Sequence, residues 1–232
     1  SLQGQRNKNR NLPCQDYSKH STKGKNFVAI VSDGAGSAKY GKIGARIVCE
    51  TLVDLLKNSS FKDIRENIVY AISIARNKLE RHRFNKGNIN DFAATIVGLV
   101  HNKKQGIFFH IGDGAAIAFN DTDYEDFIIS KPENGAFSCE TYFYTMDEWK
   151  RALRFTTFDK YNTFILMSDG LTGFSFTNRY DRIEEKFLSP INDFLNAEPV
   201  KCKVIKALNK TLGNPKAGKI NSDDKTFIWA KV

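Results

Sequence analysis

The sequence has few residues of the kinds that mark a metal-thiolate or disulfide-rich protein. It contains four cysteines in 232 residues, and no two of them form a C-x-x-C pair. Its four histidines show no H-x-x-H or H-E-x-x-H spacing, so the patterns typical of a zinc site are missing. Scattered cysteines favour free thiols in a reducing compartment over a disulfide framework, and no Cys-His pattern supports a thiol nucleophile.

Long apolar stretches are also missing. No run approaches the 18 or so residues that a membrane span needs, and the first residues are polar and basic, without the apolar block of a signal peptide. We therefore expect a cytoplasmic protein that does not enter a membrane. A content of 41% hydrophobic and 26% charged residues is typical of a globular protein. No linker or repeat divides the chain, which predicts a single domain over residues 1–232.

The charge is unbalanced, with 35 basic and 26 acidic residues and a net charge of +9. A solvated basic surface is the simplest interpretation, because the basic stretches are dispersed along the chain. Attraction to a phosphorylated or acidic protein is the second interpretation. Nucleic acid comes third, since no basic patch is interleaved with aromatic residues. The basic stretches are residues 6–10, 19–25, 78–86 and 201–219.

Three apolar runs, each typical of a buried strand, end at an Asp beside a Gly. They are residues 27–31 before Asp33-Gly34, residues 108–111 before Gly112-Asp113-Gly114, and residues 164–167 before Asp169-Gly170. A single Asp-Gly pair is explained by a turn. Three pairs at strand ends favour a shared acidic cluster, because a buried carboxylate is costly unless a partner such as a metal ion accompanies it.

Further candidates lie near the two ends of the chain. Asp16 lies in the irregular or edge-strand segment expected near the N-terminus, and Asp223 and Asp224 precede the last strand. Carboxylate ligands without His or Cys favour Mg²⁺ or Mn²⁺. From the pattern alone, a metal site and ordinary turns remain equally open. Arg6 and Arg10 lie close to Asp16 in the sequence and suggest an anion site, because Arg suits bidentate phosphate contacts.

The periodicity predicts helices flanking a mainly antiparallel β core, which is an α+β fold. Residues 93–100 and 107–111 are expected to form an antiparallel hairpin. Residues 120–162 have weak periodicity and form either a lid over the site or ordinary surface strands and loops, with a turn at 132–135 and a strand at 140–143. The other expected elements are an irregular or edge-strand segment at 1–16, helices at 40–57, 61–82, 178–188 and 199–212, strands at 115–119 and 226–232, and a loop at 216–221.

Together the motifs resemble the metal-dependent serine/threonine phosphatases of the protein phosphatase 2C family. They occur in the family's order over residues 4–232, and residues 13–16, 132–135 and 140–141 resemble its bacterial branch. The matching elements are Asp33-Gly34-Ala35-Gly36-Ser37 for D-G-x-G-G, Gly112-Asp113-Gly114 for G-D-S, Ser168-Asp169-Gly170 for S-D-G, and Asp223-Asp224-Lys225-Thr226 for D-N-x-T.

The resemblance implies a four-layer α-β-β-α sandwich, with two mainly antiparallel sheets flanked by helices and two Mg²⁺ or Mn²⁺ ions at one end. Asp33, Asp169 and Asp223 would be the catalytic residues. Arg6 or Arg10 would bind the substrate phosphate, with Arg6 favoured. The implied metal ligands are Asp33 bridging both ions with the Gly34 carbonyl, Asp169 and Asp223 on one ion, Asp16 near the other through water, and Asp113 at a third, weaker site.

The implied activity is hydrolysis of phosphoserine or phosphothreonine in proteins by a water that two metal ions activate. The implied partners are a phosphorylated protein and a cognate serine/threonine kinase system in bacterial signalling, with the enzyme a monomer. Several positions depart from the family pattern and motivate an alternative, a catalytically weak relative used as a binding or regulatory module. These positions are Asn11 for Arg, Gln15 for Glu, Ala35 for the His of some members, Gly114-Ala115 for Ser-Arg, and Asp224 for Asn.

Overall fold

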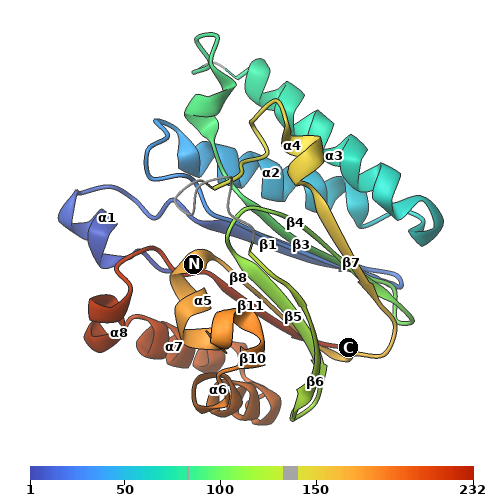
Figure 1. Ribbon diagram of the computed structural model, residues 1–232, viewed down its shortest axis with the longest axis vertical. Helices are drawn as coiled ribbons and strands as arrows, with labels where there is room; N and C mark the ends of the chain where they lie inside the picture. Colours follow the sequence, from blue (N-terminus) through green and yellow to red (C-terminus); the bar gives the residue numbers. More distant parts are fainter. Residues whose placement is uncertain (83, 133–140) are drawn as a thin grey trace.

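The computed structural model describes residues 1–82, 84–132 and 141–232. Its elements form four layers, with helices α2 and α3 over one sheet and helices α5, α6 and α7 over the other (Figure 1). Both sheets are antiparallel, which confirms the predicted α-β-β-α sandwich. The turn expected at 132–135 and the first residue of the strand expected at 140–143 fall largely in 133–140, outside the described residues.

The first sheet has the strand order β1-β2-β3-β4-β7. The expected hairpin is confirmed, because β3 and β4 pair antiparallel with Ile96 opposite Ile111. Because β2 and β4 are both antiparallel to β3, β2 and β4 end at the same edge of the sheet and β3 ends at the opposite edge. The bounds are β1 (Tyr17–Lys23), β2 (Asn26–Ser32), β3 (Ile96–His101), β4 (Gly106–Ile111) and β7 (Arg154–Phe158).

The second sheet has the order β11-β8-β5-β6. Strands β6 and β7 come from the segment 120–162, so the described part of that segment contributes ordinary strands to both sheets. The bounds are β5 (Ala115–Asn120), β6 (Asp123–Ser130), β8 (Thr163–Met167) and β11 (Phe227–Lys231), with a small ribbon of β9 (Phe176–Thr177) and β10 (Arg182–Ile183).

Helices α2 (Gly41–Leu56) and α3 (Ile64–Glu80) match the expected amphipathic segments. Short 3₁₀ turns occupy 61–63, 89–92 and 178–180. The remaining helices are α1 (Gln5–Asn9), α4 (Trp149–Ala152), α5 (Asp169–Ser175), α6 (Glu185–Ala197), α7 (Lys201–Leu212) and α8 (Pro215–Ile220).

Three sequence-based expectations about helices were wrong. Residues 5–9 are helical rather than irregular, and 215–220 form a helix where a loop was expected. Asn214 caps this last helix by accepting a hydrogen bond from the Lys216 amide, and Pro at the first position suits a helix start. Helix α6 begins later than predicted and continues through Pro190. Its buried residues Leu188, Ile191 and Leu195 keep a helical stripe across the proline, and their packing outweighs the lost backbone hydrogen bond.

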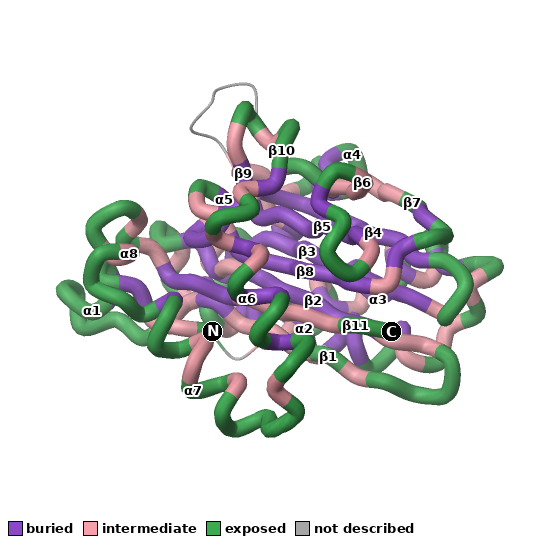
Figure 2. The backbone as a smooth tube through the Cα atoms, turned by 90° about the horizontal axis from the view of Figure 1, so that it is seen from below, coloured by how far each residue is buried: buried purple, intermediate pink, exposed green. Residues whose placement is uncertain are grey.

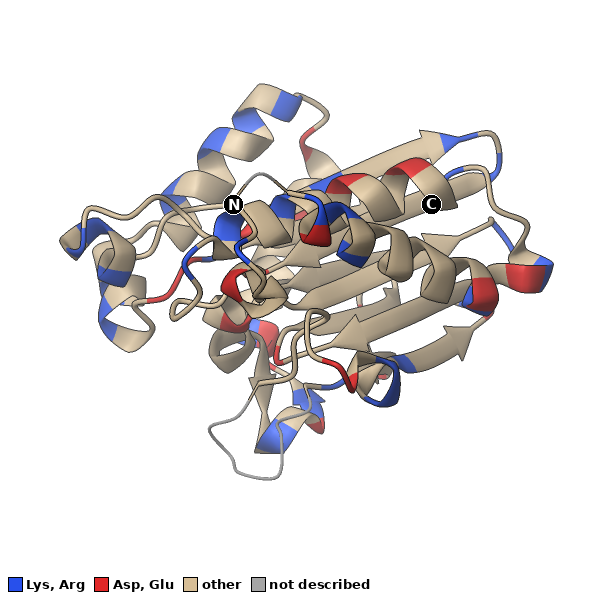
Figure 3. Ribbon diagram, turned by 90° about the horizontal axis from the view of Figure 1, so that it is seen from above, with Lys and Arg blue, Asp and Glu red and all other residues tan. Residues whose placement is uncertain are grey.

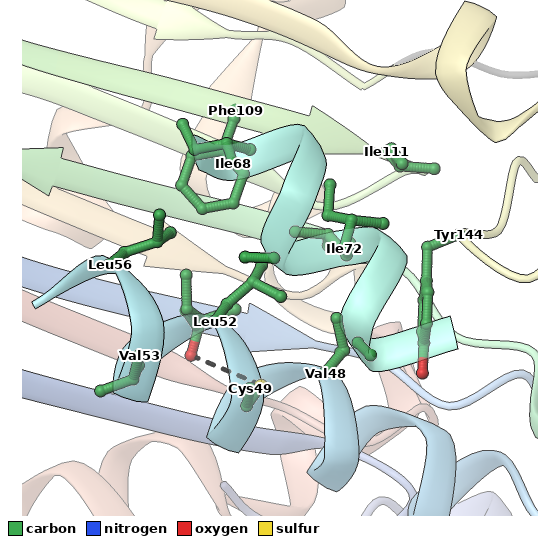
Figure 4. Close-up of a cluster of buried hydrophobic side chains, with 14 of the residues drawn as sticks. Val48, Cys49, Leu52, Val53, Leu56, Ile68, Ile72, Phe109, Ile111 and Tyr144 are labelled. Atoms are coloured by element: carbon green, nitrogen blue, oxygen red, sulfur yellow. Dashed lines mark hydrogen bonds between the residues drawn. The ribbon is translucent and has the colours of Figure 1, made fainter. Parts of the chain in front are cut away.

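The layers are joined by apolar cores. Side chains of α2, α3 and β4 interdigitate over the first sheet, among them Leu52, Ile72 and Phe109 (Figure 4). Buried residues line the strands of both sheets, whereas the outer helices are exposed on one side (Figure 2). Such continuous packing makes the sandwich a rigid support for groups at the strand ends. In the described part of the chain, no helix combines the length and the apolar character needed to cross a membrane.

Candidate active site

The antiparallel register gathers the acidic residues at one end of the sandwich. Tyr17 of β1 lies opposite Ser32 of β2, so Asp16 and Asp33 are neighbours. Strands β11 and β8 are antiparallel as well, and the start of β11 therefore lies at the end of β8. Carboxylates from both termini and from the middle of the chain thus meet where the two sheets face each other.

A cleft of about 420 Å³ opens at this end. It is lined by six of the eight predicted site residues, namely Arg6, Asp33, Gly34, Asp113, Asp169 and Asp223. The structure does not bring the other two to its wall. Asp16 is buried at 3% exposure behind Asp33, and Arg10 is exposed at the end of α1.

Asp16 is held by two hydroxyl groups from the second sheet. Ser168 and Thr226 each donate a hydrogen bond to its Oδ2, at 2.7 and 2.8 Å. The Thr226 amide in turn donates to Ser168 Oγ at 2.9 Å. This network links the start of β1 to the end of β8 and the start of β11, so it fixes one sheet against the other at the site. Both hydroxyls belong to residues of the Asp-containing motifs, but the motif pattern alone does not predict these contacts.

Thr95 positions Asp33 through the backbone. The Asp33 amide donates to Thr95 Oγ1 at 3.0 Å, and the Thr95 amide donates to the Asp33 carbonyl at 2.9 Å. Gly34 packs so closely on α2 that a Cβ would lie 2.3 Å from the Gly41 carbonyl carbon. Only glycine allows this approach, and it leaves the Gly34 backbone at the cleft.

Asp113 is oriented by Thr141, whose hydroxyl donates to Asp113 Oδ2 at 2.7 Å. The preceding Gly112 has a φ of +115°, a conformation that favours glycine. On the other side, a Cβ on Gly114 would lie 2.6 Å from the Met167 carbonyl oxygen. The departure from the family's Ser at Gly114 therefore has a packing reason here.

Burial and mutual repulsion raise the pKa values of the cluster. Burial, followed by the charges of Asp16 and Asp169, raises the pKa of Asp33 well above its usual range. Burial, followed by the charges of Asp113, Asp223 and Asp16, raises the pKa of Asp169 to about 7. Burial also raises the pKa of Asp16 and of Asp113. The cluster therefore favours an added positive charge, either protons or a cation.

The donor chemistry of the cluster fits a hard divalent cation. Within the described residues, the buried Oδ1 atoms of Asp16, Asp113 and Asp169 have no hydrogen-bond partner. An all-oxygen donor set is what Mg²⁺ and Mn²⁺ prefer. In the same part of the chain, no group of three or more His, Cys, Asp or Glu side chains is already arranged so that it could hold a metal ion. Repulsion between like charges explains why the carboxylates do not converge by themselves.

Arg6 reaches the cleft from α1. Its Nη1 lies 2.7 Å from Asp223 Oδ1. A Cβ on Gly36 would lie 2.7 Å from Arg6 Nη2, so the glycine leaves room for the guanidinium group. A planar guanidinium at the rim of an acidic cleft suits bidentate contact with a phosphoryl group. Asn11, where many family members have Arg, is exposed with a φ of +54° at the end of the helical segment.

Asp224 has a role that the sequence analysis did not foresee. It is only 4% exposed and accepts hydrogen bonds from the Gly4 amide at 2.6 Å, from Asn7 Nδ2 at 2.8 Å and from the Gln15 amide at 2.6 Å. These bonds fasten α1 to the start of β11. The Asp at the family's Asn position therefore supports the helix that carries Arg6.

The four-layer sandwich and the acidic cleft at its end fit the class of metal-dependent phosphatases. Comparison with known families agrees, because residues 3–212 match the family Protein phosphatase 2C. The chain belongs to this family of serine/threonine protein phosphatases.

Individual relatives agree with the family. The chain is 24% identical over 236 aligned residues to Serine/threonine-protein phosphatase 3 of Escherichia coli, covering 95% of this chain and 92% of that protein. The fold is similar to that of the serine/threonine phosphatase Stp1 from Staphylococcus aureus (TM-score 0.62, 16% identity, 95% and 89% of the two chains). It is also similar to RsbX in complex with magnesium (TM-score 0.55, 18% identity, 94% and 87%).

Proposed function

We propose that this protein hydrolyses phosphoserine and phosphothreonine in proteins at the acidic cleft, with water as the nucleophile. The observation that carries the proposal is the set of five aspartates that line one cleft together with Arg6, namely Asp33, Asp113, Asp169, Asp223 and Asp224. Among the described residues that line the cleft there is no Cys or His. Direct attack by a metal-activated water on phosphorus needs no phospho-enzyme, so this lining is consistent with that mechanism.

The chain's own residues have separate roles in this proposal. Arg6 binds two phosphoryl oxygens and orients the phosphorus toward the carboxylates. Asp33, Asp169 and Asp223 would hold the divalent cations, and the Gly34 carbonyl beside Asp33 would be a further oxygen ligand. Asp16 acts from behind, where its Oδ1 is free of hydrogen bonds. When bound, Mg²⁺ or Mn²⁺ would supply the Lewis acid that activates water and offsets charge on the phosphoryl oxygens.

The proposal also covers the number and identity of the metal ions and the cellular setting of the protein. Asp16, Asp33, Asp169 and Asp223 are enough carboxylates for two divalent ions. The Oδ1 of Asp113, which has no hydrogen-bond partner among the described residues, supports a third, weaker site. The magnesium complex of the structural neighbour RsbX supports Mg²⁺ as one of the metals. We also propose a cytoplasmic monomer that acts in bacterial signalling opposite a cognate serine/threonine kinase, in keeping with bacterial relatives. A catalytically weak binding module is not favoured, because no acidic position of the motifs is lost.

The proposal is tested by phosphate release from a phosphothreonine peptide in Mn²⁺ and in chelator. We expect activity only with the metal, and a loss on the order of a hundredfold or more in Asp33→Asn and in Asp169→Asn, since each change removes a charge from the centre. Asp54→Asn is the matched control, because Asp54 is exposed on α2, far from the cleft lining. Equal activity in chelator, or full activity in both cleft variants, would disprove the proposal.

A further inference from the structure

Helices α1 and α8 carry exposed cations beside the catalytic cleft. The segments that contain them, residues 1–15 and 201–222, include no Asp or Glu. Lys and Arg gather at the end of the molecule that holds α1 (Figure 3). We call this the α1–α8 surface and define it by four exposed residues, Lys8, Arg10, Lys216 and Lys219.

The two helices lie side by side across a narrow gap. A Cβ added to Gly218 of α8 would come to 4.0 Å from the Cβ of Gln5 in α1. A groove of about 350 Å³ runs between them, and Lys8 and Lys219 line it from opposite helices. Segments at the two ends of the sequence thus form one continuous surface.

Helix α1 separates this groove from the catalytic cleft. Successive residues of a helix are rotated by about 100°, so side chains two positions apart point to nearly opposite sides. Arg6 accordingly lines the cleft, whereas Lys8 lines the groove. A polypeptide with its phosphorylated residue at Arg6 would reach Lys8 and Lys219 by crossing one short helix.

The cations of the α1–α8 surface are free to bind a partner. In the described part of the chain, no acidic side chain lies within 4.0 Å of Lys8, Arg10, Lys216 or Lys219, and the nearby Asp223 is paired with Arg6. Unpaired charges of one sign next to a cleft attract an oppositely charged ligand and raise its association rate.

The surface suits an acidic peptide better than a nucleic acid. Residues 1–15 and 201–222 contain no aromatic residue on which a base could stack. Ile220, at the end of α8, is 74% exposed and offers an apolar contact next to Lys219. Charged and apolar contacts side by side fit a polypeptide with mixed side chains.

From these contacts we infer that the α1–α8 surface binds acidic residues that flank the phosphorylated residue of the protein substrate. The inference rests on the proposed phosphatase activity and adds a substrate class to it, namely phosphoproteins with an acidic segment next to the phosphorylation site. Lys8 and Lys219 determine specificity in this arrangement and take no part in the chemistry.

The test compares two phosphothreonine peptides, one with three flanking Glu residues and one with Gln at those positions, and uses p-nitrophenyl phosphate as a substrate without flanks. At low salt we expect kcat/KM to be on the order of tenfold higher for the Glu peptide, and this preference to fall as salt screens the charges. The double variant Lys8→Glu/Lys219→Glu should lose the preference and keep its activity on p-nitrophenyl phosphate.

The matched control is Lys23→Glu/Lys104→Glu, which changes the net charge equally at two exposed positions at the other end of the strands, the last residue of β1 and the connection between β3 and β4. It should keep the preference. Equal kcat/KM for the two peptides in the wild type would overturn the inference, as would a preference that survives in the Lys8/Lys219 variant. The inference would also be overturned if the Lys8→Glu/Lys219→Glu variant lost binding of a single-stranded oligonucleotide but still bound the Glu peptide. Failure to hydrolyse any of the three substrates in Mn²⁺ would instead refute the proposed activity.

Discussion

Replacement of Asp224 by Ala should detach α1 from the body of the protein. The carboxylate is 4% exposed and accepts three hydrogen bonds, at 2.6, 2.8 and 2.6 Å, from donors on the N-terminal segment. Hydrogen bonds to a charged group contribute about 1.5–3 kcal/mol each. The carboxylate also repels Asp16, and its removal relieves that cost. Because water can reach α1 once it moves, we expect a net loss of about 3–4 kcal/mol in the free energy of unfolding.

The measurement is urea unfolding followed by circular dichroism in chelator, so that metal binding does not contribute. Asp224→Asn is the graded comparison, because the amide keeps one acceptor oxygen and should cost only about 1–2 kcal/mol. Asp54→Ala is the control, since its exposed ion pair with Lys57 should be worth no more than about 1 kcal/mol. The KM for a phosphopeptide should rise in parallel in Asp224→Ala, because Arg6 loses its support. A change below about 1 kcal/mol would refute this account of Asp224.

Two further predictions concern charge in the cleft. With metal removed, stability should fall as pH rises from about 4 to 7, because native Asp169, with its pKa raised to about 7, holds a proton that the unfolded chain has released. The fall in stability should be smaller in Asp169→Asn. Burial lowers the pKa of His110, so this residue makes stability rise with pH, and the variant separates the contribution of Asp169 from that opposite one. An identical pH profile for the variant and the wild type would contradict the role of Asp169. Arg6→Lys should raise KM on the order of tenfold, since a point charge replaces a bidentate contact, whereas Arg10→Lys should change KM by less than about twofold. Similar KM values for both variants would show that Arg6 does not bind the phosphate.

Much of the fold could be predicted from the sequence because local periodicity and burial agree in it. The strands before Asp33, Asp113 and Asp169 and the stripes of α2 and α3 fall where the pattern places them. The predicted secondary structure was wrong where tertiary contacts determine whether a segment is helical. The polar residues of α1 form a helix because Asp224 binds the amide of its N-cap residue Gly4 and the side chain of Asn7, and α6 continues through Pro190 because its apolar face is buried.

The order of residues along the chain is enough to show which carboxylates are present, which strands precede them, and that oxygen ligands without His or Cys suit a hard cation. How these carboxylates are distributed around the site depends on the tertiary structure. It put Asp33, Asp113, Asp169 and Asp223 at the cleft and Asp16 behind it, because antiparallel register, not sequence distance, sets which strand ends meet. It also brought Arg6 rather than Arg10 to the cleft, because Arg6 lies within α1 and pairs with Asp223, whereas Arg10 follows the last helical residue and is exposed.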